Sequence, residues 1–86
     1  MGGIRSVFRA VLGGRADANI RFAELVRLLL WLGFDERIRG GHHVFTRDGL
    51  EEIINLQPRG GMAKPYQIKQ VRDLITRYQL GVDADD

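Results

Sequence analysis

The spacing of apolar residues changes twice along this chain, and this change limits the fold more than any other feature. Between residues 22 and 32, and again between 65 and 80, apolar side chains recur every three or four residues, as in helices with one buried stripe. Between them, residues 34–58 contain short alternating and β-branched runs separated by glycines, which favour strands. Helix, strands and helix in this order predict an α+β domain, with helices on one face of an antiparallel sheet and the other face open.

An additional helix is predicted at the N-terminus. It ends at Gly13-Gly14, and its apolar stripe consists of Ile4, Val7, Phe8, Val11 and Leu12. We expect residues 1–18 to form a helical extension packed on the domain or on a partner. Asp17-Ala18-Asn19 is then a linker, with Asn19 as a candidate cap for the next helix.

The helix predicted from Phe22 to Leu32 ends at Gly33 and has an unusually broad apolar face. Leu28, Leu30 and Trp31 widen its stripe, so we expect burial over much of its circumference. The stripe itself consists of Phe22, Leu25, Val26, Leu29 and Leu32.

Glycine-rich turns divide the strand region. Arg37-Ile38-Arg39 alternates, Gly40-Gly41 follows, and the run from His42 to Thr46 has the β-branched and aromatic content of a strand. Asp48-Gly49 is a turn signal. Glu51–Leu56 fits either a short helix or a third strand, and we predict Arg59-Gly60-Gly61 to be a flexible loop.

The last predicted helix begins at Pro65 and ends near Leu80, before Gly81. Its apolar face contains Ile68, Val71, Leu74, Ile75 and Tyr78, and its polar face Lys69, Arg72 and Thr76. Three acids occupy the last four residues, and we expect residues 81–86 to be a disordered acidic tail. The domain proper is therefore predicted to span residues 19–80.

Composition narrows the classes of function. The absence of cysteine excludes disulfides and cysteine-based zinc sites. The longest apolar run, residues 28–32, is far shorter than the ~20 residues that cross a bilayer, so we expect a soluble cytoplasmic protein with no membrane association. The net charge is +2, but it becomes +5 for residues 1–82, which suits a polyanionic partner as well as a merely solvated surface.

His42 and His43 are the candidate catalytic residues. A histidine titrates near neutral pH, so it can take a proton from a ribose 2′-hydroxyl, whose oxygen then attacks the neighbouring phosphodiester. Successive strand residues point to opposite faces, so only one of the two can address a bound RNA. We favour His42 because it directly follows the glycines. The alternative is that both are ordinary strand histidines.

Other chemistry finds less support. A metal site would have to use His42, His43, Glu51 and Glu52, and adjacent strand histidines chelate one ion poorly. Ser6 is the only serine, and no glycine-rich nucleotide-binding motif is present, so we expect no metal and no small-molecule cofactor. Tyr66 either stacks on a base or packs against the sheet. The candidate phosphate-binding residues are Arg37, Arg39, Gly40, Gly41, Arg59, Lys64, Lys69 and Arg72.

The segment Gly40-Gly41-His42-His43-Val44-Phe45, after Leu32-Gly33-Phe34, resembles the HicA toxin family, whose signature is a small-residue pair followed by histidine at a strand start. The resemblance covers Asp17 to Leu80. Its remaining residues are Asp17-Ala18-Asn19-Ile20, Phe22, Leu29-Leu30, Asn55-Leu56-Gln57, Lys64-Pro65-Tyr66-Gln67 and Lys69-Gln70-Val71-Arg72.

The resemblance implies a fold like that of double-stranded-RNA-binding domains, with helix, three strands and helix, and so favours a strand at Glu51–Leu56. It also implies cleavage of mRNA without metal, restrained by a HicB-like antitoxin that covers the histidine face. The family's catalytic histidine corresponds to His42, although in some members it lies one place later, at His43.

Two departures from the family pattern bear on activity. Gly41 stands where serine is usual, and its missing hydroxyl cannot bind the phosphate or the histidine. The third strand ends in Asn55-Leu56-Gln57-Pro58 instead of the basic or histidine-containing segment of many members, so no role for it carries over. Two other hypotheses remain, a non-catalytic double-stranded-RNA-binding module and a protein–protein module whose open sheet face docks another chain.

Overall fold

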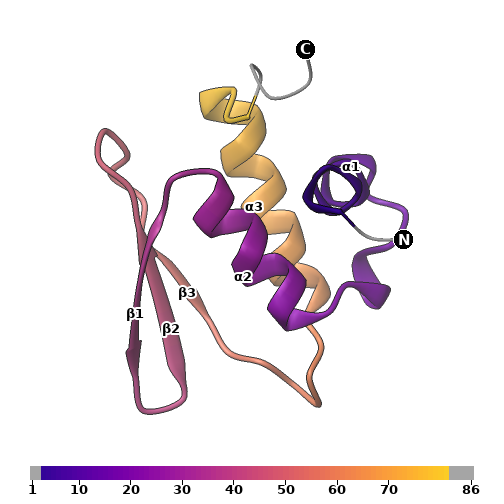
Figure 1. Cartoon of the computed structure of the whole chain (residues 1–86), viewed down its shortest axis with the longest axis horizontal. Helices are drawn as coiled ribbons and strands as arrows, with labels where there is room; N and C mark the ends of the chain where they lie inside the picture. The colour runs from indigo at the N-terminus through magenta and orange to yellow at the C-terminus, as the bar shows by residue number, and fades with distance from the viewer. Residues whose placement is uncertain (1–2, 82–86) are drawn as a thin grey trace.

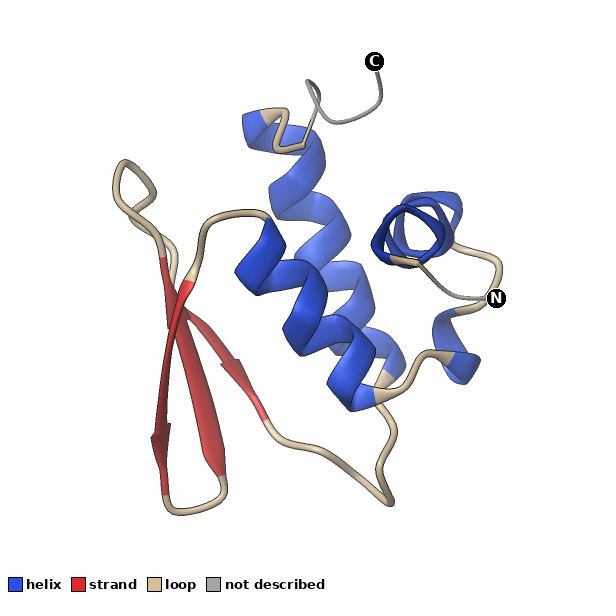
Figure 2. Ribbon diagram, viewed as in Figure 1, coloured by secondary structure: helices blue, strands red, loops and turns tan. Residues whose placement is uncertain are grey.

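The molecule consists of one antiparallel sheet covered on one face by helices (Figures 1 and 2). The structure of the protein is a computed structural model, which describes residues 3–81. The α+β class predicted from the sequence is confirmed. The elements in chain order are α1 (Ile4–Gly13), the short 3₁₀ helix η1 (Asp17–Asn19), α2 (Phe22–Trp31), β1 (Asp35–Arg39), β2 (His42–Thr46), β3 (Ile54–Leu56) and α3 (Pro65–Tyr78).

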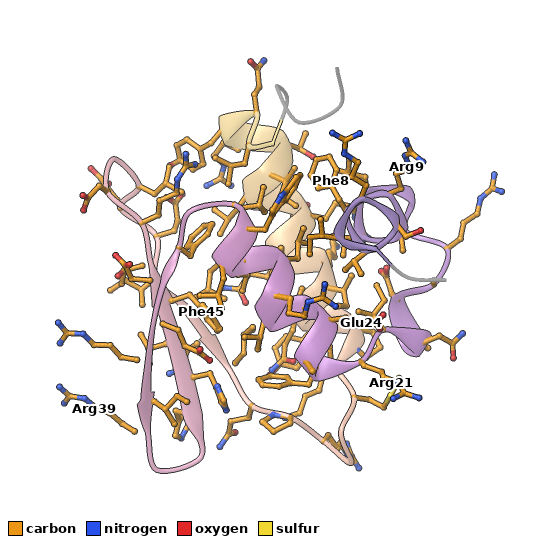
Figure 3. All side chains as sticks on the ribbon, viewed as in Figure 1. Phe8, Arg9, Arg21, Glu24, Arg39 and Phe45 are labelled. Carbon is orange, nitrogen blue, oxygen red and sulfur yellow. The ribbon has the colours of Figure 1, made fainter. Side chains whose placement is uncertain are left out.

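The sheet has the order β1-β2-β3, and both pairs of strands are antiparallel. Phe45 lies opposite Ile54 in the register, and both side chains are fully buried, so this face of the sheet rests on the helices. Figure 3 shows Phe45 directed toward the helices and Arg39 directed away from them. The opposite face carries no helix (Figure 2).

The helices form one core with the sheet. Leu25, Leu28 and Leu29 of α2 are fully buried, because α2 lies between the sheet and α1 (Figure 1). Val7 and Phe8 of α1 belong to the same buried cluster as the sheet residues. The N-terminal helix is therefore part of the domain core and packs on α2 and α3. None of the helices described within residues 3–81 is long and apolar enough to cross a membrane.

Several helix details differ from the expectations. Leu30 and Trp31 are exposed, so the buried stripe of α2 is widened by Leu28 alone, although the Trp31 ring meets the Phe8 ring edge-on at 5.6 Å. Asn19 does not cap α2. The N-cap is Arg21, whose backbone N–H donates to the Glu24 carboxylate at 3.0 Å.

The C-terminal half shows three further differences. β3 covers only Ile54–Leu56 of the six residues predicted as a strand. The predicted flexible loop is a tight turn, in which Arg59 and Met62 exchange two backbone hydrogen bonds of 3.0 Å each. α3 ends at Tyr78, because the next residue, Gln79, adopts a left-handed conformation with φ 53°. The Tyr78 side chain, predicted on the apolar face, is exposed. The predicted acidic tail lies outside the described residues, apart from Gly81.

Candidate functional site

The glycine pair forms the two-residue turn of the β1–β2 hairpin. Arg39 and His42 face each other directly across the two strands, which leaves Gly40 and Gly41 as the whole connection. Gly40 has φ +59° and Gly41 does not have a positive φ, the pattern of a turn whose first central position needs glycine. The turn thus places a histidine and an arginine side by side at the end of the sheet.

His42 lies on the open face of the sheet, where two amide side chains of the β3 segment contact its ring. Nδ1 lies 3.0 Å from Asn55 Oδ1, and Nε2 lies 3.4 Å from Gln57 Nε2. An amide oxygen only accepts, so Nδ1 must carry the proton that is shared with Asn55. In the neutral ring Nε2 then bears the lone pair, the form that a general base requires.

Two arginines flank this imidazole on the same face. Arg39 is the direct cross-strand partner of His42, and Arg37 lies two residues earlier on β1, opposite Val44. Both side chains are exposed and make no hydrogen bond or ion pair with any residue between 3 and 81. Asp35 shares this face only at the far end of β1. The end of the face near the turn is therefore cationic and available to an anion.

His43 occupies a different environment on the helix side of the sheet. Its Nδ1 donates to Glu36 Oε2 at 2.7 Å, and its ring meets the Phe22 ring edge-on at 4.8 Å. The side chains of His43 and Glu36 are only 22% and 19% exposed. A half-buried histidine held between a carboxylate and an aromatic ring is a structural pair, and it cannot reach a ligand on the open face.

The remaining predicted phosphate-binding residues do not gather around His42. Arg72 points to the opposite side of the molecule, where it donates to Asp17 Oδ1 and to the Val11 carbonyl at 3.0 Å each. The hydrogen bond to Asp17 raises the pKa of the Arg72 guanidinium. Lys69 is exposed on α3. The expected polar face of α3 is therefore not one continuous phosphate-binding surface.

A second group of predicted residues lies where the turn after β3 meets the start of α3. Arg59, Lys64 and Tyr66 line one hollow of the surface there. The Lys64 ammonium lies 5.9 Å from the centre of the Tyr66 ring. Tyr66 is 63% exposed, so it does not pack against the sheet.

Two glutamines that the sequence analysis did not name as site residues connect these two groups. Gln57 contacts His42, and its carbonyl accepts a hydrogen bond of 3.2 Å from the Gln67 side chain. The Gln67 oxygen in turn accepts the backbone N–H of Lys64 at 3.0 Å. Gln67 is almost completely buried, the one buried polar residue in the described part of the chain. Asn55, the other contact of the His42 ring, was not named as a site residue either, and its two-residue spacing from Gln57 was the available signal for both.

The residues considered as metal ligands are dispersed. His42 and His43 face opposite sides of the sheet, and Glu52 binds Arg77 and the Tyr78 hydroxyl near the end of α3. Within residues 3–81 no three histidine, aspartate or glutamate side chains come together in a metal-binding group.

Comparison with known proteins finds no match among protein-family models, curated proteins or solved structures. The resemblance to HicA toxins therefore depends only on the residues quoted above, and the function must be argued from the geometry of the site.

Proposed function

We propose that this chain is a metal-independent endoribonuclease whose general base is His42. The observation that carries the proposal is the pair of contacts that the two nitrogens of the His42 ring make. Asn55 fixes the proton on Nδ1, and Nε2 faces the open surface with only the long contact to Gln57. A substrate hydroxyl that displaces the Gln57 amide would find a lone pair directed at it.

The proposed reaction is an intramolecular transfer within RNA. Nε2 of His42 takes the proton of a ribose 2′-hydroxyl, and the 2′-oxygen forms a bond to the adjacent phosphorus. The bond from phosphorus to the 5′-oxygen breaks, and that oxygen takes a proton from water. The products are a 2′,3′-cyclic phosphate and a 5′-hydroxyl, and no oxidant, metal or cofactor enters the balance.

The arginines of β1 supply the charge that this step needs. Arg39 lies directly across from His42, so its guanidinium can bind the oxygens of the phosphate that is attacked. Negative charge on these oxygens grows in the transition state, where a positioned cation stabilises it most. Arg37 extends the cationic strip to a neighbouring phosphate.

The resemblance to HicA toxins supports a biological role for this activity. We propose that the chain is the toxin of a toxin–antitoxin pair, acting on mRNA in the cytoplasm and held inactive by a HicB-like antitoxin. Such a partner would have to cover the open face around His42 and Arg39. Acidic side chains at its interface would complement the two arginines.

Cleavage of RNA in the presence of a chelator tests the proposal. We expect the wild-type chain to produce fragments with 2′,3′-cyclic phosphate ends, and His42→Ala to be slower by roughly 10²–10⁴-fold. His43→Gln is the matched control, because glutamine can still donate to Glu36, and it should retain most of the activity. Equal cleavage by His42→Ala and wild type would refute the role of His42. Binding of duplex RNA without any chain scission would favour the non-catalytic module.

A further inference from the structure

We propose that Tyr66 and Lys64 form a subsite for one unpaired nucleobase and its phosphate, so that the substrate is single-stranded RNA. The inference rests on the proposed function, because it adds a second RNA contact to the proposed catalytic site at His42. The juxtaposition that carries it is an exposed aromatic ring in one hollow with Lys64 and Arg59, joined to the histidine site through the Gln67 and Gln57 side chains.

The Tyr66 side chain is unusual for an aromatic residue in so small a domain. It is 63% exposed, the highest exposure among the aromatic residues described, although it follows directly after the helix start at Pro65. Phe8, Phe22, Phe34 and Phe45 are all buried in the core. An aromatic ring left in water loses its packing contribution, but a base that stacks on it restores the contact.

Cations border the ring. The Lys64 ammonium lies 5.9 Å from the ring centre, and Arg59 lines the same hollow. Neither Lys64 nor Arg59 forms an ion pair with a carboxylate within residues 3–81. Single-stranded nucleic acid is bound by this combination, in which aromatic faces hold bases and neighbouring cations hold the backbone.

The subsite is fixed relative to the catalytic histidine. Gln67, which follows Tyr66 in α3, donates to the Gln57 carbonyl, and the Gln57 side chain contacts Nε2 of His42. Gln67 also accepts the backbone N–H of Lys64. The two hydrogen bonds of the buried Gln67 side chain are part-buried and hold the first turn of α3 against the segment after β3, whereas the contact of Gln57 with His42 is exposed. A base on Tyr66 would thus lie at a fixed number of nucleotides from the phosphate at His42.

Stacking on Tyr66 requires a base that is not paired. A base inside a duplex exposes only its edges, so a duplex can offer phosphates to Lys64 but no π-face to the ring. The subsite therefore distinguishes single-stranded from double-stranded RNA, although the fold resembles that of double-stranded-RNA-binding domains.

Binding of an oligonucleotide that cannot be cleaved tests the subsite independently of catalysis. The probe is a fluorescein-labelled 2′-O-methyl RNA of mixed sequence, which lacks the nucleophilic hydroxyl, and fluorescence anisotropy gives its Kd. Tyr66→Ala should weaken binding about 5- to 150-fold, the loss typical of one stacked base. Tyr66→Phe and Tyr66→Trp should bind as well as wild type, whereas Tyr66→Leu should resemble the alanine variant.

Two controls separate the possible failures. Ile53→Ala removes a side chain of similar exposure beside α3 from a different part of the surface and should leave the Kd unchanged. A 2′-O-methyl duplex of the same sequence should bind wild type and Tyr66→Ala equally. The subsite is refuted if Tyr66→Ala binds the single strand like wild type, or if it weakens binding of strand and duplex by the same factor. Loss of cleavage in His42→Ala, with its binding unchanged, would leave the proposed function standing in either case.

Discussion

The contact between Asn55 and His42 gives a quantitative test of the proposed base. Removing the Asn55 amide with Asn55→Ala deletes the acceptor that lies 3.0 Å from Nδ1 of the ring. The neutral imidazole can then place its proton on either nitrogen, and the form with the proton on Nε2 cannot accept from a hydroxyl. The variant leaves His42 in place and changes only which of its nitrogens is free.

The expected magnitude follows from the strength of one exposed hydrogen bond. Such a bond contributes about 0.5–1.5 kcal/mol, so losing it should lower the ratio of the competent form to the other neutral form about 2- to 12-fold. Because the competent form predominates in the wild type, the rate should fall by less than this factor. Gln57→Ala is the contrasting variant, because its amide lies 3.4 Å from Nε2 and competes with the substrate for that position. We expect its rate to equal or exceed that of wild type.

Single-turnover cleavage of a labelled RNA at saturating protein measures this effect without a contribution from binding. The full cycle includes Asn55→Ala in the His42→Ala background, where the residual rate should not fall any further. If Asn55→Ala slows cleavage equally in both backgrounds, Asn55 contacts the substrate and does not act through the imidazole. If the Asn55→Ala variant cleaves at the wild-type rate, the hydrogen bond that holds the proton on Nδ1 is not what makes His42 a base.

Three further experiments test other parts of the structure. Gly41→Ser should fold normally, because its new Cβ would lie 3.6 Å from Gln57 Nε2 without a clash, and it should cleave faster, because the added hydroxyl can bind the phosphate or the histidine. Gly40→Ser should lower the free energy of unfolding by about 1–2 kcal/mol, because φ at Gly40 is +59°. Equal urea midpoints for the two variants would contradict this. Arg72→Met should lower the free energy of unfolding by about 1 kcal/mol and leave the salt dependence of RNA binding unchanged. Arg39→Ala should instead reduce the slope of the logarithm of the RNA-binding constant against the logarithm of salt concentration by about 1. The Tyr78 hydroxyl and then Arg77 hold the pKa of Glu52 below 4.5, so this carboxylate stabilises the fold above its unfolded pKa and loses that effect as pH falls through its folded pKa. Tyr78→Phe should therefore lower the urea midpoint at pH 7 and have a smaller effect at pH 3; an equal loss at both pH values would show that the hydroxyl acts through packing alone.

The elements that were predicted well are those whose evidence is local. The stripes of α2 and α3 recur with the helical period, and both helices end within two residues of the predicted positions. β3 was overestimated because its limit is set by a distant contact. Glu52 is held by Arg77 and Tyr78, 25 and 26 residues away, so the chain before Ile54 is directed toward α3 and not along the sheet.

The same distinction applies to the site. The opposite directions of His42 and His43 follow from the strand period alone, and the structure agrees. Asn55 and Gln57 could not be placed beside His42 from the sequence, because that requires the β2–β3 register across a seven-residue connection, from 47 to 53. Arg72 was misjudged for a related reason. Its partner Asp17 lies 55 residues away, and helical periodicity alone places the side chain on a solvated face.

The choice between the two histidines is in the end a matter of core packing. His43 and Phe45 share one face of β2, and Phe45 is fully buried opposite the fully buried Ile54. A slip of one residue would bring His42 to the helix side, but it would also expose Phe45, at a cost of about 1.5–3 kcal/mol from that side chain alone. The two-residue turn at Gly40 and Gly41 fixes the same register from the other end of the strand. Packing under β2 therefore determines which imidazole faces the open surface, so that substitutions of Phe45 should impair the proposed site as well as stability.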